Sequence, residues 1–295
     1  MNHPIVKKKK LNHLNYLIRV KAPQVAERFQ AGQFVIIRMH EKGERIPLTV
    51  AEVNKKEETI TLVFQVVGKS TLELSSMKAG EALLNVVGPL GNPTKIKKIG
   101  RVICVGGGTG IACIYPIIKA MGRAGNEVTS VIGAQTASLL ILEDEIKKAS
   151  HQTFVATDDG SRGYHGFVTD ILKRLIHEST AKEIGEVILI GPAPMMKVGA
   201  EVTRPYGIKT LASLNTIMVD GTGMCGGCRV FVNGEMSLTC IDGPEFDAHE
   251  VNFDEVIRRL DMFKEKEKLA LENYKKKEKN HENRWKKGSH EGTAF

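Results

Sequence analysis

Arg101–Ala112 decides the fold, with the sequence Arg-Val-Ile-Cys-Val-Gly-Gly-Gly-Thr-Gly-Ile-Ala. Its first half is a continuous apolar run, which is typical of a strand buried on both faces. The glycines then lead into a segment of helical period, 111–123. A strand that ends in glycines and opens into a helix presents N–H groups and a positive dipole end to a phosphate. Ile111 replaces the last glycine of the usual G-x-G-x-x-G fingerprint, so a plain strand–helix turn is the alternative.

Strands and helices alternate after this stretch. Predicted strands lie at 127–133, 152–157 and 186–190, and predicted helices at 138–148, 168–177 and 194–200. This alternation predicts a parallel sheet with both faces covered, whose carboxyl-end loops rim a ligand crevice. Those loops are Asp158–Gly163 and Gly191–Met195, although both are also ordinary turn sequences. The strand at 127–133 is followed by no Lys or Arg up to Thr136, which favours NAD over NADP because a 2′-phosphate needs a cation.

Residues 11–94, before this domain, have the pattern of an all-β barrel or sandwich. Short runs rich in Val, Ile, Leu and Phe occur at 16–21, 33–39, 48–53, 59–67 and 82–87, separated by polar, Gly or Pro residues. Several strands at roughly ten-residue spacing are typical of such folds.

The strongest local motif is Asp220-x4-Cys225-x2-Cys228, followed by Cys240. Glycines between the cysteines allow a tight loop that directs the sulfurs at one centre, and plant-type [2Fe–2S] proteins use Cys-x4-Cys-x2-Cys with a distant fourth cysteine. Here Asp220 stands at the first position, and a carboxylate can ligate iron. A Cys3Asp zinc site and a redox dithiol are the alternatives. The other two cysteines, Cys104 and Cys113, are predicted core thiols, and the histidines have no metal-ligand spacing.

Composition excludes several classes of protein. With 42% hydrophobic and 26% charged residues the chain is not wholly disordered, and no apolar run is long enough for a membrane span. The odd count of 5 Cys and the lack of a signal-like start predict a cytoplasmic protein. The net charge of +8 comes entirely from Lys7–Lys10 and from the surplus of basic residues over 264–295. The body of the chain, residues 11–263, is therefore neutral. This distribution argues against nucleic-acid binding.

The order of these parts resembles the ferredoxin–NADP reductase superfamily. Arg45-x-Pro47-Leu48-Thr49 and Gly68-Lys69-Ser70-Thr71 come first, then the glycine turn, Asp158–Ser161, Gly191–Met195 and the cysteine loop. Within the superfamily, the chain resembles the electron-transfer subunits of dihydroorotate dehydrogenase. It resembles more closely the small subunits of NADH-dependent reduced-ferredoxin:NADP oxidoreductases, which are electron-bifurcating transhydrogenases. The first group has four cysteines around its cluster, and the second has the Asp-x4-Cys-x2-Cys-x11-Cys arrangement found here.

The resemblance implies three cofactors. FAD would bind the barrel through Arg45, Pro47, Leu48, Thr49, Gly68, Lys69, Ser70 and Thr71, with Thr49 as the candidate contact of flavin N5. NAD(H) would bind Gly107, Gly108, Thr109, Gly110, Asp158, Asp159, Gly160, Ser161, Pro192, Met195 and Met196. A [2Fe–2S] cluster would be held by Asp220, Cys225, Cys228 and Cys240. Ile190 stands where many superfamily members have a cysteine near the nicotinamide.

From these observations we predict four regions: an FAD-binding β-barrel (1–97, six-stranded type), an NAD(H)-binding α/β domain (98–214), a [2Fe–2S] module (215–250) and a C-terminal helix with a charged tail (251–295). The predicted reaction is hydride exchange between NAD(H) and FAD, with no side-chain acid or base, followed by single-electron transfer through the cluster. The resemblance implies a heterodimer with a large flavin and [4Fe–4S] subunit that handles NADP(H) and reaches ferredoxin. The alternatives are a dihydroorotate dehydrogenase electron-transfer subunit and a zinc-containing nucleotide-binding regulator.

Overall fold

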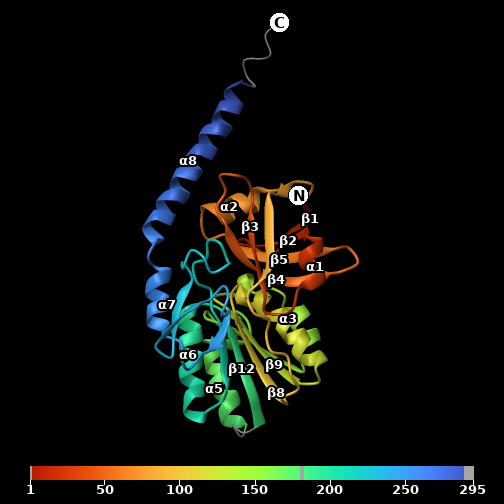
Figure 1. The fold of residues 1–295 in the computed structure, drawn as a ribbon, viewed down its shortest axis with the longest axis vertical. Coiled ribbons are helices and arrows are strands. Elements are labelled where there is room, and N and C mark those ends of the chain that lie inside the picture. Colours follow the sequence, from red (N-terminus) through yellow and green to blue (C-terminus); the bar gives the residue numbers. More distant parts are fainter. Residues whose placement is uncertain (1, 180–182, 289–295) are drawn as a thin grey trace.

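The computed structural model describes residues 2–179 and 183–288, which form two lobes, a loop module and two C-terminal helices (Figure 1). The first lobe is an antiparallel barrel with the strand order β6-β1-β2-β5-β4-β3-β7. Its elements are β1 (His3–Lys10), β2 (Asn15–Lys21), α1 (Pro23–Arg28), β3 (Phe34–Arg38), β4 (Ile46–Asn54), β5 (Thr59–Gln65), α2 (Lys69–Ser76), β6 (Ala82–Leu83) and β7 (Asn85–Leu90).

The barrel closes through the chain segment 82–90. This run is interrupted at Leu84, and its first part, β6, pairs with β1 while its second part, β7, pairs with β3. The two parts of this run therefore join the two edges of the sheet and nearly close the barrel, with only His3 and Pro4 of β1 paired to β6. The predicted six-stranded type corresponds to six runs of chain, one of which is divided into two strands.

Strand β1 is the barrel element that the sequence pattern did not indicate, because its lysines were assigned to a basic end segment. Ile5 is fully buried in the barrel core. Lys8 donates from Nζ to the carbonyl oxygen of Met77 at 2.7 Å, and both Lys8 and Lys10 lie over the ring of Tyr16. The lysines thus lie on a mostly exposed strand, which pairs with β2 across a register shift between Ile5 and Lys7.

The second lobe is a parallel sheet with the order β11-β10-β9-β8-β12-β13-β16, in which only the edge strand β16 is antiparallel. Its elements are β8 (Arg101–Gly107), α3 (Gly110–Arg123), β9 (Glu127–Ala134), η1 (Ala137–Leu139), α4 (Glu143–Ala149), β10 (Gln152–Thr157), β11 (Tyr164–His165), α5 (Val168–Glu178), β12 (Ile184–Ile190), α6 (Ala193–Thr203), η3 (Arg204–Tyr206), β13 (Thr210–Ser213) and β16 (Glu245–Asp247). The predicted antiparallel barrel and parallel-sheet domain are confirmed.

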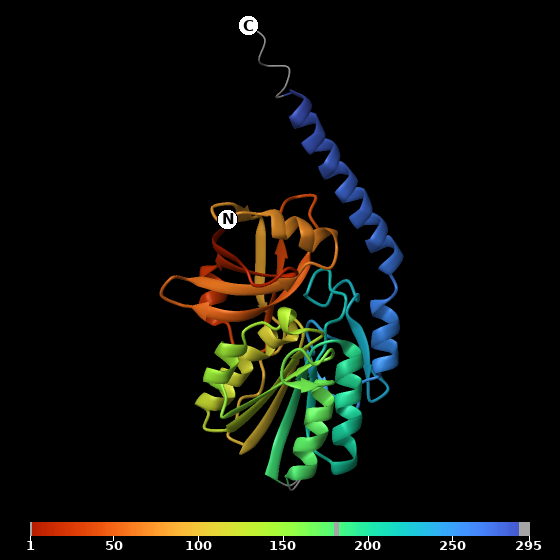
Figure 2. The same ribbon diagram turned by 180° about the vertical axis from the view of Figure 1, so that it is seen from behind.

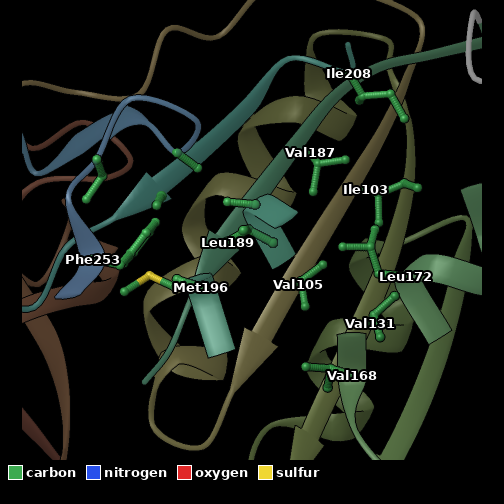
Figure 3. Packing of buried hydrophobic residues seen from close by; sticks show 14 of the residues in the cluster. Ile103, Val105, Val131, Val168, Leu172, Val187, Leu189, Met196, Ile208 and Phe253 are labelled. Carbon is green, nitrogen blue, oxygen red and sulfur yellow. The ribbon is translucent and has the colours of Figure 1, made fainter. Parts of the chain in front are cut away.

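Alternate residues of β8 face opposite sides of this sheet, as a strand buried on both faces requires. Ile103 and Val105 pack in one core with Leu172 of α5 and Met196 of α6 (Figure 3). Cys104 packs in the other core, with residues of α3 and α4. The predicted role of Cys104 as a core thiol fits this position.

The loop module lies between β13 and β16 in the chain, and the C-terminal helices follow β16. The module contains a hairpin of β14 (Arg229–Val232) and β15 (Glu235–Leu238), and the helices are α7 (Phe253–Leu260) and α8 (Lys264–Gly288). Asn252 caps α7 as expected, accepting the N–H of Glu255 at 3.0 Å. Helix α8 passes the barrel and projects beyond it (Figures 1 and 2), and the predicted frayed end at 289–295 lies outside the described residues. None of the helices in the described ranges is long and apolar enough to span a membrane.

Candidate functional site

Two cavities adjoin where the barrel meets the carboxyl edge of the parallel sheet. The sheet-end cavity has a volume of about 590 Å³ and the barrel cavity about 630 Å³. The residues that line both are Gln65, Gly107, Gly108, Thr109 and Pro192. A ligand in one cavity would therefore touch the same wall as a ligand in the other.

The sheet-end cavity is built on the glycine turn. Gly107, Gly108 and Thr109 line it, and Gly110 begins α3 directly against β12. A Cβ atom at Gly110 would lie 2.3 Å from the carbonyl oxygen of Ile190, so only glycine permits this packing. The turn thus fixes a helix N-terminus at the cavity wall, the arrangement expected for phosphate binding.

The loops after β10 and β12 complete this cavity in part. Asp158, Pro192 and Met195 line it. Asp159 and Ser161 hydrogen-bond to each other in an exposed loop, and Ser161 Oγ accepts the N–H of Ala137 at 2.8 Å. Gly160 is in the same exposed loop. Met196, in contrast, is fully buried in the core and does not line the cavity.

The charges around the sheet-end cavity are acidic. Asp158 and Asp170 line it, and no Lys or Arg does so among the described residues. Arg162, next to the cavity loop, pairs with Glu143 at 2.9 Å, and Glu143 also pairs with Lys147 at 2.6 Å. The hydrogen bond from Arg162, aided by Lys147, lowers the pKa of the Glu143 carboxyl. The charge of Arg162 is therefore already balanced by Glu143.

The barrel cavity receives only part of the predicted flavin set. Pro47, Leu48 and Thr49 line it from β4, and Thr71 lines it from α2. Arg45, Gly68, Lys69 and Ser70 do not line it. Arg45 is exposed, while Lys69 and Ser70 contact Glu44 instead. The predicted turn at 68–71 is the start of a helix, because Gly68 is the N-cap of α2.

Gln65 and Cys113 are among the cavity-lining residues that the sequence analysis did not assign to a site. Thr109 donates from Oγ1 to Oε1 of Gln65 at 3.2 Å, which links the glycine turn to the end of β5. A polar residue at the end of the apolar run 59–67 was the available signal for Gln65. Cys113, predicted as a core thiol, is half-buried and lines the barrel cavity. Burial raises the pKa of its thiol, so it is protonated at neutral pH.

The cysteine loop lies beside the barrel cavity, which Met218 also lines. Cys228 and Cys240 are buried against Phe34 and Ile36 of the barrel, with their Sγ atoms 3.2 Å apart. Both are free cysteines. Two buried sulfurs in contact without a disulfide are arranged to bind a common metal centre.

Half-buried Asp220 and exposed Cys225 form a second pair in the same loop. The Asp220 carboxylate accepts N–H groups from Thr222 at 2.9 Å and Cys225 at 2.8 Å. These bonds, that of Thr222 first, lower the pKa of Asp220 and keep it ionised. In the part of the chain that the structure describes, no three metal-ligating side chains converge on one point. Donors grouped as two pairs fit a binuclear cluster, in which each of two irons binds two protein ligands, better than a single tetrahedral zinc ion.

Comparison with known proteins agrees with this geometry. Residues 215–252 match the iron–sulfur cluster binding domain of dihydroorotate dehydrogenase B, and residues 104–201 match the oxidoreductase NAD-binding domain. The chain is 47% identical over 272 residues to the dihydroorotate dehydrogenase B (NAD(+)) electron transfer subunit homolog of Thermotoga maritima, covering 92% of this chain and 95% of that protein. The chain belongs to the dihydroorotate dehydrogenase B electron-transfer-subunit family.

Solved structures extend the comparison. A chain of the NADH-dependent reduced ferredoxin-NADP oxidoreductase, studied for flavin-based electron bifurcation, is 46% identical, with a TM-score of 0.87 over 93% of this chain and 98% of that one. A Neisseria gonorrhoeae ferredoxin NADP+ reductase is 18% identical, with a TM-score of 0.59 over 70% of this chain and 91% of that one, which shows a shared fold. These comparisons confirm the predicted superfamily and the electron-transfer role of this family member. They also confirm the NAD-binding oxidoreductase domain and the iron–sulfur domain.

Proposed function

We propose that this chain is the small subunit of a ferredoxin/NAD/NADP transhydrogenase. It exchanges a hydride between NAD(H) in the sheet-end cavity and FAD in the barrel cavity, and passes single electrons through a [2Fe–2S] cluster to a partner subunit. The observation that supports this best is the shared wall of the two cavities, with the cysteine loop at the rim of the barrel cavity. FAD supplies the chemistry that joins the two-electron and one-electron carriers.

The side chains at the junction position the cofactors. The N–H groups of the glycine turn hold the dinucleotide phosphates, and Pro47, Leu48 and Thr49 form the barrel wall of the flavin site. Thr49 remains our candidate for the contact with flavin N5. Hydride transfer needs stacking and exclusion of water, and the apolar side chains in the lining of the barrel cavity, such as Phe34 and Leu48, offer surfaces for stacking.

Asp220, Cys225, Cys228 and Cys240 are the proposed ligands of the cluster. The buried cysteine pair faces the barrel, and in the second pair Cys225 is exposed while Asp220 is half-buried. Electrons can therefore enter from the flavin side and leave from the exposed side. A carboxylate is a harder ligand than a thiolate, so Asp220 alters the potential of the cluster.

An exposed apolar patch supports a protein partner at this point. Val219 is 47% exposed, Met224 88% and Ile241 46%, and each stands next to a proposed cluster ligand in the sequence. Exposed apolar side chains of this kind mark association surfaces. We propose that the large flavin and [4Fe–4S] subunit, which handles NADP(H) and reaches ferredoxin, covers this patch in a heterodimer. We expect a cytoplasmic complex, because the thiolate ligands require a reducing compartment.

Anaerobic purification tests the proposal. We expect flavin absorbance, dye reduction driven by NADH, and a [2Fe–2S] EPR signal after reduction with dithionite. A protein without that signal and with stoichiometric zinc would refute the electron-transfer role and favour the zinc-containing regulator.

A dihydroorotate dehydrogenase electron-transfer subunit is the second candidate, because the domain match at 215–252 carries that description. Asp220 in place of a fourth cysteine favours the transhydrogenase. Identification of the co-purifying chain separates the two: the second candidate requires an FMN-binding catalytic subunit of orotate synthesis, and the first a larger subunit with [4Fe–4S] clusters.

A further inference from the structure

Helix α7 reaches the cysteine loop through one side chain. Arg259 donates from Nη2 to the carbonyl oxygen of Gly227, the residue before Cys228, at 3.0 Å. Asn252 caps the helix, and Phe253 and Val256 anchor it in the core of the α/β lobe. The guanidinium is therefore held by a rigid element rather than by the loop that it contacts.

The surroundings of this contact are closed. The gap between α7 and the loop has a volume of only about 10 Å³, and it is lined by Thr216, Ile217, Gly227, Arg229, Val256, Arg259 and Leu260. Such a gap admits at most one water molecule. Arg259 is half-buried, so water screens its charge less than that of a fully exposed side chain.

Arg259 also lacks a counter-charge. Its neighbour Arg258 pairs with Glu255, and Lys197 on α6 pairs with Asp254 of α7. For Arg259 the only hydrogen bond found among the described residues goes to a neutral carbonyl, and no carboxylate there lies within ion-pair distance. A partly buried cation without an anion is unfavourable, so an anion is expected nearby.

We infer that Arg259 is the counter-charge of the iron–sulfur cluster and raises its reduction potential. The inference rests on the proposed function, since it requires the cluster at Asp220, Cys225, Cys228 and Cys240. A cluster with three thiolate ligands and one carboxylate is anionic, and one-electron reduction adds a further negative charge. A fixed guanidinium next to the loop stabilises the reduced form more than the oxidised form. Arg259 is thus a positioning residue for the loop and an electrostatic determinant of electron transfer.

Three variants of the anaerobically purified protein test this inference. Arg259→Gln removes the charge, Arg259→Lys keeps the charge but not the guanidinium fork, and Arg258→Gln is the matched control on the adjacent, exposed residue. The measurements are iron content and an EPR-monitored redox titration of the cluster. We expect a shift to lower potential for Arg259→Gln at unchanged iron content, a potential near wild type for Arg259→Lys, and no change for Arg258→Gln.

The outcomes distinguish the inference from the proposed function. A wild-type protein without a [2Fe–2S] signal refutes the proposed function before any variant is compared. If the cluster is present and Arg259→Gln has the wild-type potential, the inference is wrong. If Arg259→Gln loses its iron, the Arg259→Lys variant decides between two explanations. Retained iron in Arg259→Lys supports the role of the charge. An equal loss of iron shows that only the packing of the guanidinium matters, and this result overturns the inference.

Discussion

At the scale of single residues, Asp220 has two roles in the cysteine loop. Its carboxylate orders the loop by accepting two N–H groups, and its position in the motif makes it the fourth proposed ligand. An asparagine could keep one of the acceptor oxygens while losing the charge that iron requires. The two roles can therefore be separated by substitution.

We predict that Asp220→Cys retains its cluster with a shift to lower potential, since thiolate donates more charge to iron than carboxylate does. Asp220→Asn should lose most of its iron although the loop bond to Thr222 can still form. Iron analysis and redox titration of the purified proteins measure both effects. Full iron content in Asp220→Asn would show that the carboxylate is not a ligand.

At the scale of elements, the loops that follow β9 and β10 determine which dinucleotide fits. The sheet-end cavity has carboxylates but no cation among its described lining residues, and Glu143 at the start of α4 neutralises Arg162. A free guanidinium in this position could bind a 2′-phosphate. The ion pair between α4 and the loop therefore favours NAD(H).

We expect Glu143→Gln to raise kcat/KM for NADPH relative to NADH by roughly fivefold to tenfold. This is the effect of about 1 kcal/mol, which one charge-assisted contact between the freed Arg162 and the 2′-phosphate would contribute. Dye reduction with each dinucleotide measures the ratio. Glu145→Gln is the control, because Glu145 is an exposed residue of the same helix turn. The same ratio in both variants would contradict a role for Arg162 in the choice of dinucleotide.

The elements also show where the sequence pattern was sufficient. Apolar runs such as 101–105 and 186–190 predicted their strands because both faces of these strands are buried. The glycine turn at 106–110 and the cysteine spacing indicated the two site regions. Strand β1 was missed because it is mostly exposed and only Ile5 is buried, so its composition resembles that of a solvated tail. Gln65 was missed because its role depends on a contact with Thr109, which lies 44 residues away and is brought close only by the packing of the two lobes.

At the scale of the whole molecule, one half-buried carboxyl group links the segment between the two lobes to the parallel sheet. Glu245 of β16, just after the loop module, accepts a hydrogen bond from Thr94 Oγ1 at 2.5 Å, and Thr94 belongs to the segment that joins the barrel to the sheet. Thr94 in turn donates its backbone N–H to the carbonyl oxygen of Ala31 in the barrel, at 2.9 Å. Burial raises the pKa of Glu245 from 4.5 to about 7, and the bond from Thr94 only partly offsets this.

The raised pKa makes the stability of this junction depend on pH. Between about pH 4.5 and 7 the folded protein retains a proton at Glu245 that the unfolded chain releases, so the free energy of unfolding falls as pH rises through this window and levels off above it. The total change in the free energy of unfolding across this window is on the order of 3 kcal/mol.

Glu245→Gln is neutral at every pH and can still accept the Thr94 hydrogen bond. We therefore expect its free energy of unfolding to match that of wild type near pH 5 and to exceed it at pH 8. Urea denaturation midpoints of the anaerobic holoprotein at the two pH values measure this, with the exposed Glu250→Gln as control. An equal difference between Glu245→Gln and wild type at pH 5 and pH 8 would show that Glu245 does not titrate in this range, and the junction would then be held by packing and the Thr94 bond alone.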